Sequence, residues 1–314
     1  MRLAAVLLAL CVAATSVAAQ SYPAQQPIQL IVPFAAGGAV DGMARSFAMS
    51  MATALGGAQL VVINKEGAGG TIGFWQVARA APNGYTLGFG PSTPVTSGSI
   101  LLKGPKYDTL TPVCQTHENV MTVIVSADSP IKSIQQLMQM AKAEPGKLAY
   151  GTAGQGTVPH LSAEHMARAT GLKFNAIAYR GDSPMLVDLI GGALQFGVSS
   201  AAAAAGNNKL RVLAVFADQR QPRYPDAPTF KELGVASLAP GLNGLWAPKA
   251  TSPAVIDVLA KACEAAVQSE GFQAAARTQS QSPAYLSGAQ YRQRVATDFQ
   301  ALEKTIQSLN LKAD

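Results

Sequence analysis

Short apolar runs alternate along most of the chain with segments in which apolar residues recur every three or four positions. The apolar runs predict strands, and the segments of helical period predict helices. Strands are predicted at 28–32, 59–63, 85–89, 121–125, 148–151, 175–179, 210–217 and 243–248. Helices are predicted from about Asp41, at 72–80, from 134 to the stop at Pro145, and at 159–169, 184–190, 252–268 and 288–309. This alternation predicts an α/β protein with largely parallel sheets.

The elements fall into two blocks of the same kind. Each block runs from strand to glycine-rich loop to helix, so the pattern predicts two similar α/β lobes whose loops face each other. The last helix has an apolar face and is expected to pack back on the first lobe, which makes that lobe discontinuous. We expect residues 20–120 plus 241–314 to form lobe 1 and residues 121–240 to form lobe 2.

Two strand–helix junctions have the form of anion-binding sites. In the first, a tight Pro-Phe and Gly-Gly turn joins the strand at 28–32 to the next helix. Free backbone N–H groups and the positive end of a helix dipole meet at such a junction. The loop at 151–157 has the same character but lacks the lysine of a P-loop. Both loops therefore favour a polar anion over a nucleotide triphosphate.

A third glycine-rich loop, at 67–73, follows a strand and precedes a helix. Its spacing, G-x-G-G-x-x-G, puts Ile72 where the dinucleotide fingerprint needs glycine, and no acidic residue closes the next strand for a ribose. A turn that allows close approach of another backbone is the favoured interpretation.

Catalytic and metal-binding patterns are weak in this chain. His160 and His165 are five positions apart and so lie on different faces of a helix, which argues against a shared metal. No G-x-S-x-G motif occurs. His160 stands near a helix start, where it either contacts the capping region or donates to a ligand. The chain is expected to hold a molecule, without a cofactor or metal, and not to transform it.

The N-terminus has the pattern of an export signal. Arg2 precedes a short apolar run at 3–12, and small residues follow at 13–19. We expect residues 1–19 to be a signal peptide cleaved after Ala18 or Ala19, which places the mature protein in the periplasm. The net charge is +6, but the basic residues are scattered and only 13% of residues are charged. A nucleic-acid-binding face is therefore not expected.

Two cysteines remain after the predicted cleavage, Cys114 and Cys263. An exported protein experiences an oxidising compartment, so the two either form a disulfide or stay as buried, unpaired thiols. A bond across so long a loop would contribute about 4–5 kcal/mol in the chain-entropy model.

Several segments, in order and spacing, resemble the Bug family, the solute receptors of tripartite tricarboxylate transporters. The resemblance covers nearly all of the chain beyond the signal peptide. It is carried by PFAAGGAVD at 33–41, NKEGAGG at 64–70, APNGYTL at 81–87, PGKLAYGTAGQGTVPHL at 145–161, YRGDSP at 179–184, YPDAPTFKELG at 224–234 and GLWAPKATSP at 244–253.

The resemblance implies a two-lobed periplasmic binding protein of the type II-like, Venus-flytrap kind, with the ligand between the lobes. It also implies a carboxylated metabolite that is held mainly through main-chain groups and bridging waters and is passed to transporter membrane subunits. The alternative function is that of a ligand sensor that presents its closed form to a signalling protein. We expect a monomer. Asp41 is expected to act as an N-cap. The positions that match the family's ligand-binding loops are Phe34, Ala36, Gly37, Gly38, Asp41, Ser92, Thr93, Thr152, Ala153, Gly154, Gly156, Thr157, His160, Tyr179, Arg180 and Gly181.

The chain departs from the family on the wall opposite the first loop. Ser199 and Ser200 stand where family members usually carry an Asp-Asn pair, and Leu242 stands at a position that is commonly aromatic. The missing acid argues against recognition of a positively charged group. With Ser199 in the wall, a smaller and more apolar site is expected, suited to an aromatic or aliphatic carboxylic acid.

Overall fold

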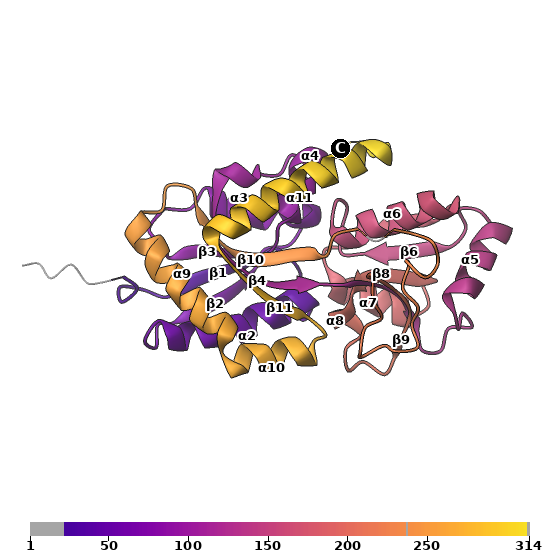
Figure 1. The fold of residues 1–314 in the computed structure, drawn as a ribbon, viewed down its shortest axis with the longest axis horizontal. Coiled ribbons are helices and arrows are strands. Elements are labelled where there is room, and N and C mark those ends of the chain that lie inside the picture. Colours follow the sequence, from indigo (N-terminus) through magenta and orange to yellow (C-terminus); the bar gives the residue numbers. More distant parts are fainter. Residues whose placement is uncertain (1–21, 237, 313–314) are drawn as a thin grey trace, which may run out of the picture.

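A computed structural model of the chain describes residues 22–236 and 238–312. The predicted signal peptide lies outside these residues. Among the helices described, none is long and apolar enough to cross a membrane. The described chain forms an elongated molecule in which two sheets lie side by side (Figure 1).

The first sheet has six strands in the order β11-β4-β10-β3-β1-β2. It is built from both ends of the chain: β1 (Ile28–Val32), β2 (Leu60–Asn64), β3 (Thr86–Pro91), β4 (Leu110–Asn119), β10 (Gly241–Pro248) and β11 (Ser282–Ser287). The helices that accompany it are α2 (Ala39–Ala54), α3 (Thr71–Ala78), α4 (Ser97–Leu101), α9 (Pro253–Gln268), α10 (Glu270–Thr278) and α11 (Gly288–Ser308).

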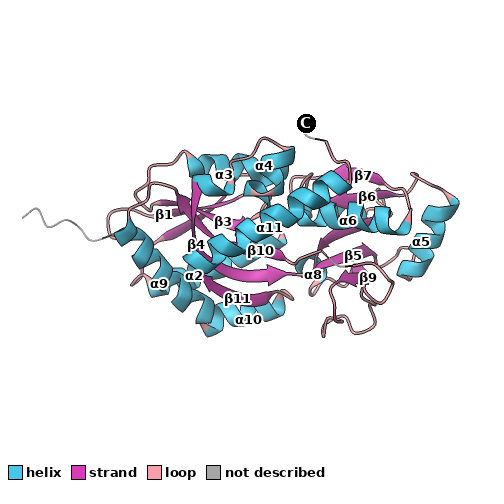
Figure 2. Cartoon of the chain, turned by 45° about the horizontal axis from the view of Figure 1, so that its top comes forward, coloured by secondary structure: helices cyan, strands magenta, loops and turns pink. Residues whose placement is uncertain are grey.

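The second sheet has five strands in the order β7-β6-β8-β5-β9, all from the middle of the chain. They are β5 (Met121–Ser126), β6 (Ala149–Thr152), β7 (Asn175–Ala178), β8 (Phe196–Ser200) and β9 (Leu210–Phe216). The accompanying helices are α5 (Ile134–Ala143), α6 (Val158–Thr170), α7 (Asp182–Ile190) and α8 (Ala201–Ala204). Helices flank both faces of each sheet (Figure 2).

Both sheets are mixed, so the expectation of largely parallel sheets is wrong. Among the strands of the described residues, only the pairs β1–β2, β1–β3, β6–β7 and β6–β8 are parallel. The strands β4, β5 and β10, which carry the chain between the sheets, pair antiparallel with their neighbours. The chain leaves the six-stranded sheet along β4 and returns to it along β10 in the opposite direction. The returning strand lies beside the strand that left, so the two pair antiparallel.

The core of the first sheet follows from alternation along β1. Ile28, Leu30 and Val32 face α2, α9 and α10, whereas Ile31 faces the opposite layer with α3 and α11. On α2, an apolar stripe of Met43, Phe47 and Met51 is buried, and Phe47 stacks on Phe89 of β3 with ring centroids 4.9 Å apart. Burial of this stripe fixes the start of α2, and with it the β1–α2 loop.

A disulfide joins Cys114 of β4 to Cys263 of α9. The two Cα atoms are 6.6 Å apart, although 149 positions separate the residues in sequence. Both side chains are fully buried in the core on the α9 side of the six-stranded sheet. Of the two alternatives left open by the sequence, the structure has the bonded one.

Candidate ligand-binding site

A cavity lies between the two sheets, where the loops after β1, β3, β6 and β8 converge. Ligands of open α/β sheets bind outside the carboxyl ends of the strands, and this cavity has that position. The empty space around it amounts to about 430 Å³, including the part open to solvent. It is lined by Phe34, Val40, Pro91, Thr93, Asn119, Met121, Ala153, Thr157, Val158, Pro159, Asp182 and Ser200.

Four of the expected ligand-binding residues lie on this cavity. Phe34 and Thr93 come from the six-stranded side, and Ala153 and Thr157 come from the five-stranded side. The structure therefore brings together the two junctions that the sequence picked out as anion sites. Contact of these four residues with a ligand stays a prediction.

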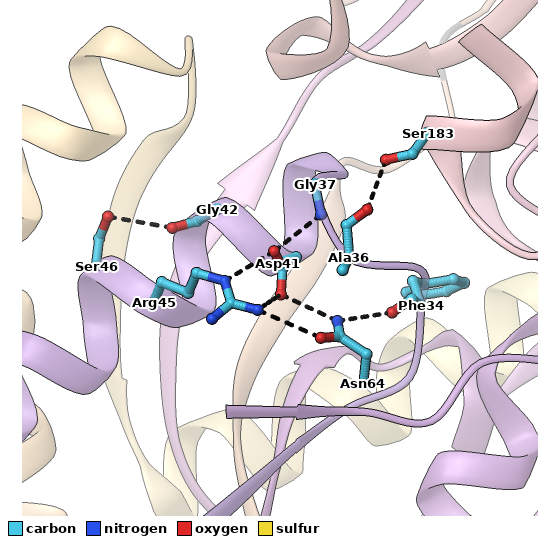
Figure 3. Close-up of polar contacts among 9 residues, drawn as sticks. All are labelled: Phe34, Ala36, Gly37, Asp41, Gly42, Arg45, Ser46, Asn64 and Ser183. Atoms are coloured by element: carbon cyan, nitrogen blue, oxygen red, sulfur yellow. Dashed lines mark hydrogen bonds and ion pairs between the residues drawn. The ribbon is translucent and has the colours of Figure 1, made fainter. Parts of the chain in front are cut away.

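Asp41 lies behind the β1–α2 loop (Figure 3) and is not the N-cap of α2. That position belongs to Gly38, because the helix begins at Ala39, earlier than expected. The Asp41 carboxylate accepts the Gly37 N–H at 2.9 Å and two hydrogen bonds from Arg45, at 2.9 and 3.0 Å. Burial by itself raises the pKa of Asp41, but these bonds outweigh it and hold the pKa below its ordinary value.

Asn64 completes the support of this loop. Its Nδ2 donates to the Asp41 carboxylate at 3.0 Å and to the Phe34 carbonyl at 2.9 Å (Figure 3). The side chain at the end of β2 thus fixes the loop at the end of β1. Asp41 and Asn64 position Phe34 on the cavity without lining it themselves.

The loops from the two sides touch each other around the cavity. Ser183 Oγ donates to the Ala36 carbonyl at 2.9 Å, and the Ala35 N–H donates to the Arg180 carbonyl at 3.2 Å. A Cβ on Gly181 would lie 2.9 Å from the Ala35 nitrogen, so this contact depends on a glycine. Ala36, Gly37, Gly38 and Gly181 therefore belong to the contact between loops.

A second contact involves the glycine-rich turn at 67–70, where a short 3-10 helix, η1 (Ala68–Gly70), forms. Gly69 has φ +58°, and a Cβ there would lie 2.4 Å from the Gln155 carbonyl oxygen. Nearby, Ser97 Oγ donates to the Gly156 carbonyl at 2.5 Å. The turn serves the close backbone approach expected of it.

Side chains of the β6–α6 segment form hydrogen bonds with the backbone of the same loop. Thr157 Oγ1 donates to the Gly154 carbonyl at 2.6 Å, and Thr152 Oγ1 accepts the Gly154 N–H at 3.4 Å. His160 Nδ1 accepts the Gly156 N–H at 3.3 Å, so this histidine contacts the capping region, one of its two expected roles. Burial lowers the pKa of His160, while Glu164 opposes that shift, and the neutral ring suits an accepting Nδ1.

Three expected residues point away from the cavity. Tyr179 donates its hydroxyl to Asp188 of α7 at 2.6 Å. The Arg180 side chain is 77% exposed and lies 4.0 Å from Glu66. Ser92 gives its N–H to the Leu242 carbonyl at 2.9 Å, and its side chain is hydrogen-bonded to Asp298 of α11. These residues support the walls of the site from outside.

Asp182, at the start of α7, lines the cavity and was missed by the sequence reasoning. Its carboxylate accepts the Ser199 hydroxyl and the N–H of Ala39, the first residue of α2. The wall around Ser199 therefore does contain an acid, contrary to the expectation from the family resemblance. The motif YRGDSP contains this aspartate, but only the tertiary fold shows that it enters the site.

Comparison with known proteins agrees with this architecture. The model of the family described as "Tripartite tricarboxylate transporter family receptor" matches residues 43–311. The chain belongs to this family. Its relatives include Protein BugT of Bordetella pertussis, 34% identical over 297 residues that make up 91% of this chain and 90% of BugT. A Cupriavidus necator protein described as "UPF0065 protein in gbd 5'region" is 34% identical over 98% of this chain and 95% of its own length.

Two similar solved structures show the same fold. The periplasmic binding protein BugD is 29% identical, with a TM-score of 0.87 over 92% of this chain and 99% of BugD. An R. palustris protein solved with adipate is 26% identical, with a TM-score of 0.87 over 93% of this chain and all of that one. The prediction of a Bug-family, two-lobed α/β binding protein is confirmed. Members of this family are periplasmic solute receptors, so this chain is a solute receptor and not an enzyme.

Proposed function

We propose that this receptor binds a small organic carboxylate in the cavity between the two sheets and delivers it to the membrane subunits of a tripartite tricarboxylate-type transporter. The observation that carries the proposal is the convergence of Phe34 and Thr93 with Ala153 and Thr157 on one cavity. The related R. palustris protein with adipate supports a carboxylate as the ligand class.

The start of α6 is the favoured place for the carboxylate. Val158 opens this helix of 13 residues, and the first N–H groups of a helix have no partner within it. Pro159 has no N–H and the Leu161 N–H donates to Thr157, so the donors at this helix start are the N–H groups of Val158 and His160. Val158 and Thr157 both line the cavity, so the positive end of the helix faces the enclosed space. Hydrogen bonds from N–H groups replace part of the hydration that a carboxylate loses on entry.

Closure of two lobes around the ligand would couple binding to recognition by the transporter. The proposed lobes are residues 20–120 plus 241–314 and residues 121–240, after removal of a signal peptide at 1–19. The sheet membership of the strands supports this division. A ligand that touches both lobes only when they are closed shifts the population towards the closed form. That form would present the surface that the membrane subunits recognise.

A thermal-shift screen tests the proposal. Ligand-free protein, checked by native mass spectrometry, is mixed with aliphatic and aromatic carboxylates and with their primary amides as uncharged controls. At a concentration 100 times its Kd, a true ligand stabilises the protein by about 2.7 kcal/mol, so Tm should rise. The matching amides should leave Tm unchanged. If no carboxylate raises Tm more than its amide, the proposal is wrong.

A further inference from the structure

The Asp182 carboxylate already belongs to the wall of the cavity. It accepts the Ala39 N–H at the start of α2 and the Ser199 hydroxyl, which are the donors that a ligand carboxylate would seek there. The residue is 8% exposed and lines the cavity. A carboxylate has room for about four hydrogen bonds, so acceptor capacity remains on Asp182 after these two.

The local fields favour a negative charge at this place and disfavour a second one. Asp182 lies in the first turn of α7 and contacts the first amide of α2, so two positive helix ends meet one carboxylate. The negative charge of Asp182 balances the positive partial charges of these two helix ends. A ligand carboxylate at the same end would be a like charge in a buried site, which is strongly unfavourable.

Ser200 adds an unmatched polar group to the wall of the cavity. The residue lines the cavity, and its Oγ is buried and has no hydrogen-bond partner among the described residues. Side chains alternate along β8, so Ser200 lies on the face that packs against α6, whereas Ser199 and Asp182 lie on the α7 face. Among the described lining residues, the charged acceptor on the α7 side is therefore Asp182 alone.

Building on the proposed carboxylate receptor, we propose that Asp182 makes the site selective for carboxylic acids that carry a hydrogen-bond donor, a hydroxyl or an ammonium group, at the end away from the carboxylate. The ligand carboxylate lies at the start of α6, and the donor reaches Asp182 on the α7 side. Dicarboxylates are disfavoured, because their second charge would meet Asp182.

The wild-type protein tests this selectivity by isothermal titration calorimetry with matched probes. The probes are straight-chain acids of four and six carbons whose far end carries a hydroxyl, an ammonium, a second carboxylate or a plain methyl. Burial raises the pKa of Asp182, so the titrations are run at pH 8, well above the ordinary pKa of an aspartate side chain. The hydroxy or amino acid of one chain length should bind about tenfold or more tightly than the matching dicarboxylate and the methyl-ended acid.

Two variants assign the preference to this carboxylate. Asp182→Asn keeps the shape but removes the charge, so the amino acid should lose about tenfold in affinity and the dicarboxylate should gain. Asp188→Asn is the matched control, since Asp188 lies on the same helix and bonds Tyr179 outside the cavity. Its ratio of affinities should equal that of the wild type.

The outcomes separate the two proposals. If carboxylates bind but the wild type does not prefer donor-bearing acids, or Asp182→Asn keeps the wild-type ratio, this inference is wrong and the receptor function stands. If no probe binds and the broad carboxylate screen is also negative, both fail. If Asp182→Asn does not fold, the relative affinities of the probes for the wild-type protein decide whether this inference holds.

Discussion

Single residues in this site owe their roles to their partners more than to their type. Asp41 and Asp182 are both carboxylates near the start of α2, yet Asp41 supports the loop from behind and Asp182 enters the cavity. The sequence places Asp41 beside the first loop because the two are adjacent in the chain. It gives no sign of Asp182, whose contact with Ala39 joins positions far apart in the sequence.

Asp298 on α11 is a half-buried carboxylate with an unusual environment. Burial raises its pKa to about 6, although Arg294 and a hydrogen bond from Ser92 oppose the shift. The folded protein thus disfavours the ionised form of Asp298 relative to the unfolded chain. Its contribution to stability is present below the ordinary pKa of about 4 and is lost as pH rises through about 6.

Asp298→Asn should remove this pH dependence. The asparagine does not ionise. The Tm of the variant minus that of the wild type should therefore increase as pH is raised from 4 to 7. Differential scanning calorimetry across this range measures the difference. Asp257→Asn, on the exposed face of α9, is the control and should follow the wild type. An Asp298→Asn curve parallel to that of the wild type would contradict the assignment.

At the scale of elements, apolar periodicity located most strands and helices to within one or two residues. The misses are informative: β4, β8, β11, α10 and the short helices α4 and α8. In β4, Gln115, Thr116 and His117 are buried polar residues that break the apolar pattern. Thr116 donates to Asn243 and Gln115 to Ala284, partners 127 and 169 positions away. No local pattern can show that such polar residues are satisfied in a core.

The turn at 67–70 was assigned correctly because its glycines mark a backbone conformation, which is a local property. Its partner, the Gln155 carbonyl, is not visible in the sequence. Gly69 should therefore tolerate a Cβ less well than a glycine of similar backbone conformation in open space. Gly56 is such a glycine, with φ +69° and no atom within 4 Å of the place that a Cβ would occupy.

Gly69→Ala should loosen the contact between the η1 turn and the β6–α6 loop, whereas Gly56→Ala should not. Both substitutions place alanine in the left-handed region, at a cost of about 1–2 kcal/mol each. Only the Gly69 variant also forces a Cβ against the Gln155 oxygen. Hydrogen exchange in a peptide covering 150–160 should accelerate in Gly69→Ala alone. Equal exchange in the two variants would show that the contact does not depend on Gly69.

For the whole molecule, the repeated order of strand, glycine-rich loop and helix was enough to predict the two-lobed fold, because each sheet buries its faces with its own helices. The contacts between the two parts were not predictable. Leu302 and Ile306, near the end of α11, share one apolar cluster with Leu101 and with Leu161 of α6. The apolar face of α11 was visible, but its last turns leave the six-stranded sheet and contact a helix of the other sheet.

This cluster should help to hold the two sheets together in the absence of ligand. Ile306 is 3% exposed, and Ile306→Ala removes apolar contact between α11 and α6 at a cost of about 2–4 kcal/mol. Val295→Ala on the same helix is the matched control, because Val295 packs within the six-stranded part, against Trp246 and Tyr291. Both variants should lower Tm, since each leaves a cavity.

Small-angle X-ray scattering distinguishes the two variants. The radius of gyration of ligand-free protein should increase for Ile306→Ala, because the two parts separate more often once the contact that joins them is weakened. It should stay at the wild-type value for Val295→Ala, whose lost contact lies on one side of the cavity only. Equal radii for both variants would mean that the loops around the cavity, and not the end of α11, set the distance between the two parts.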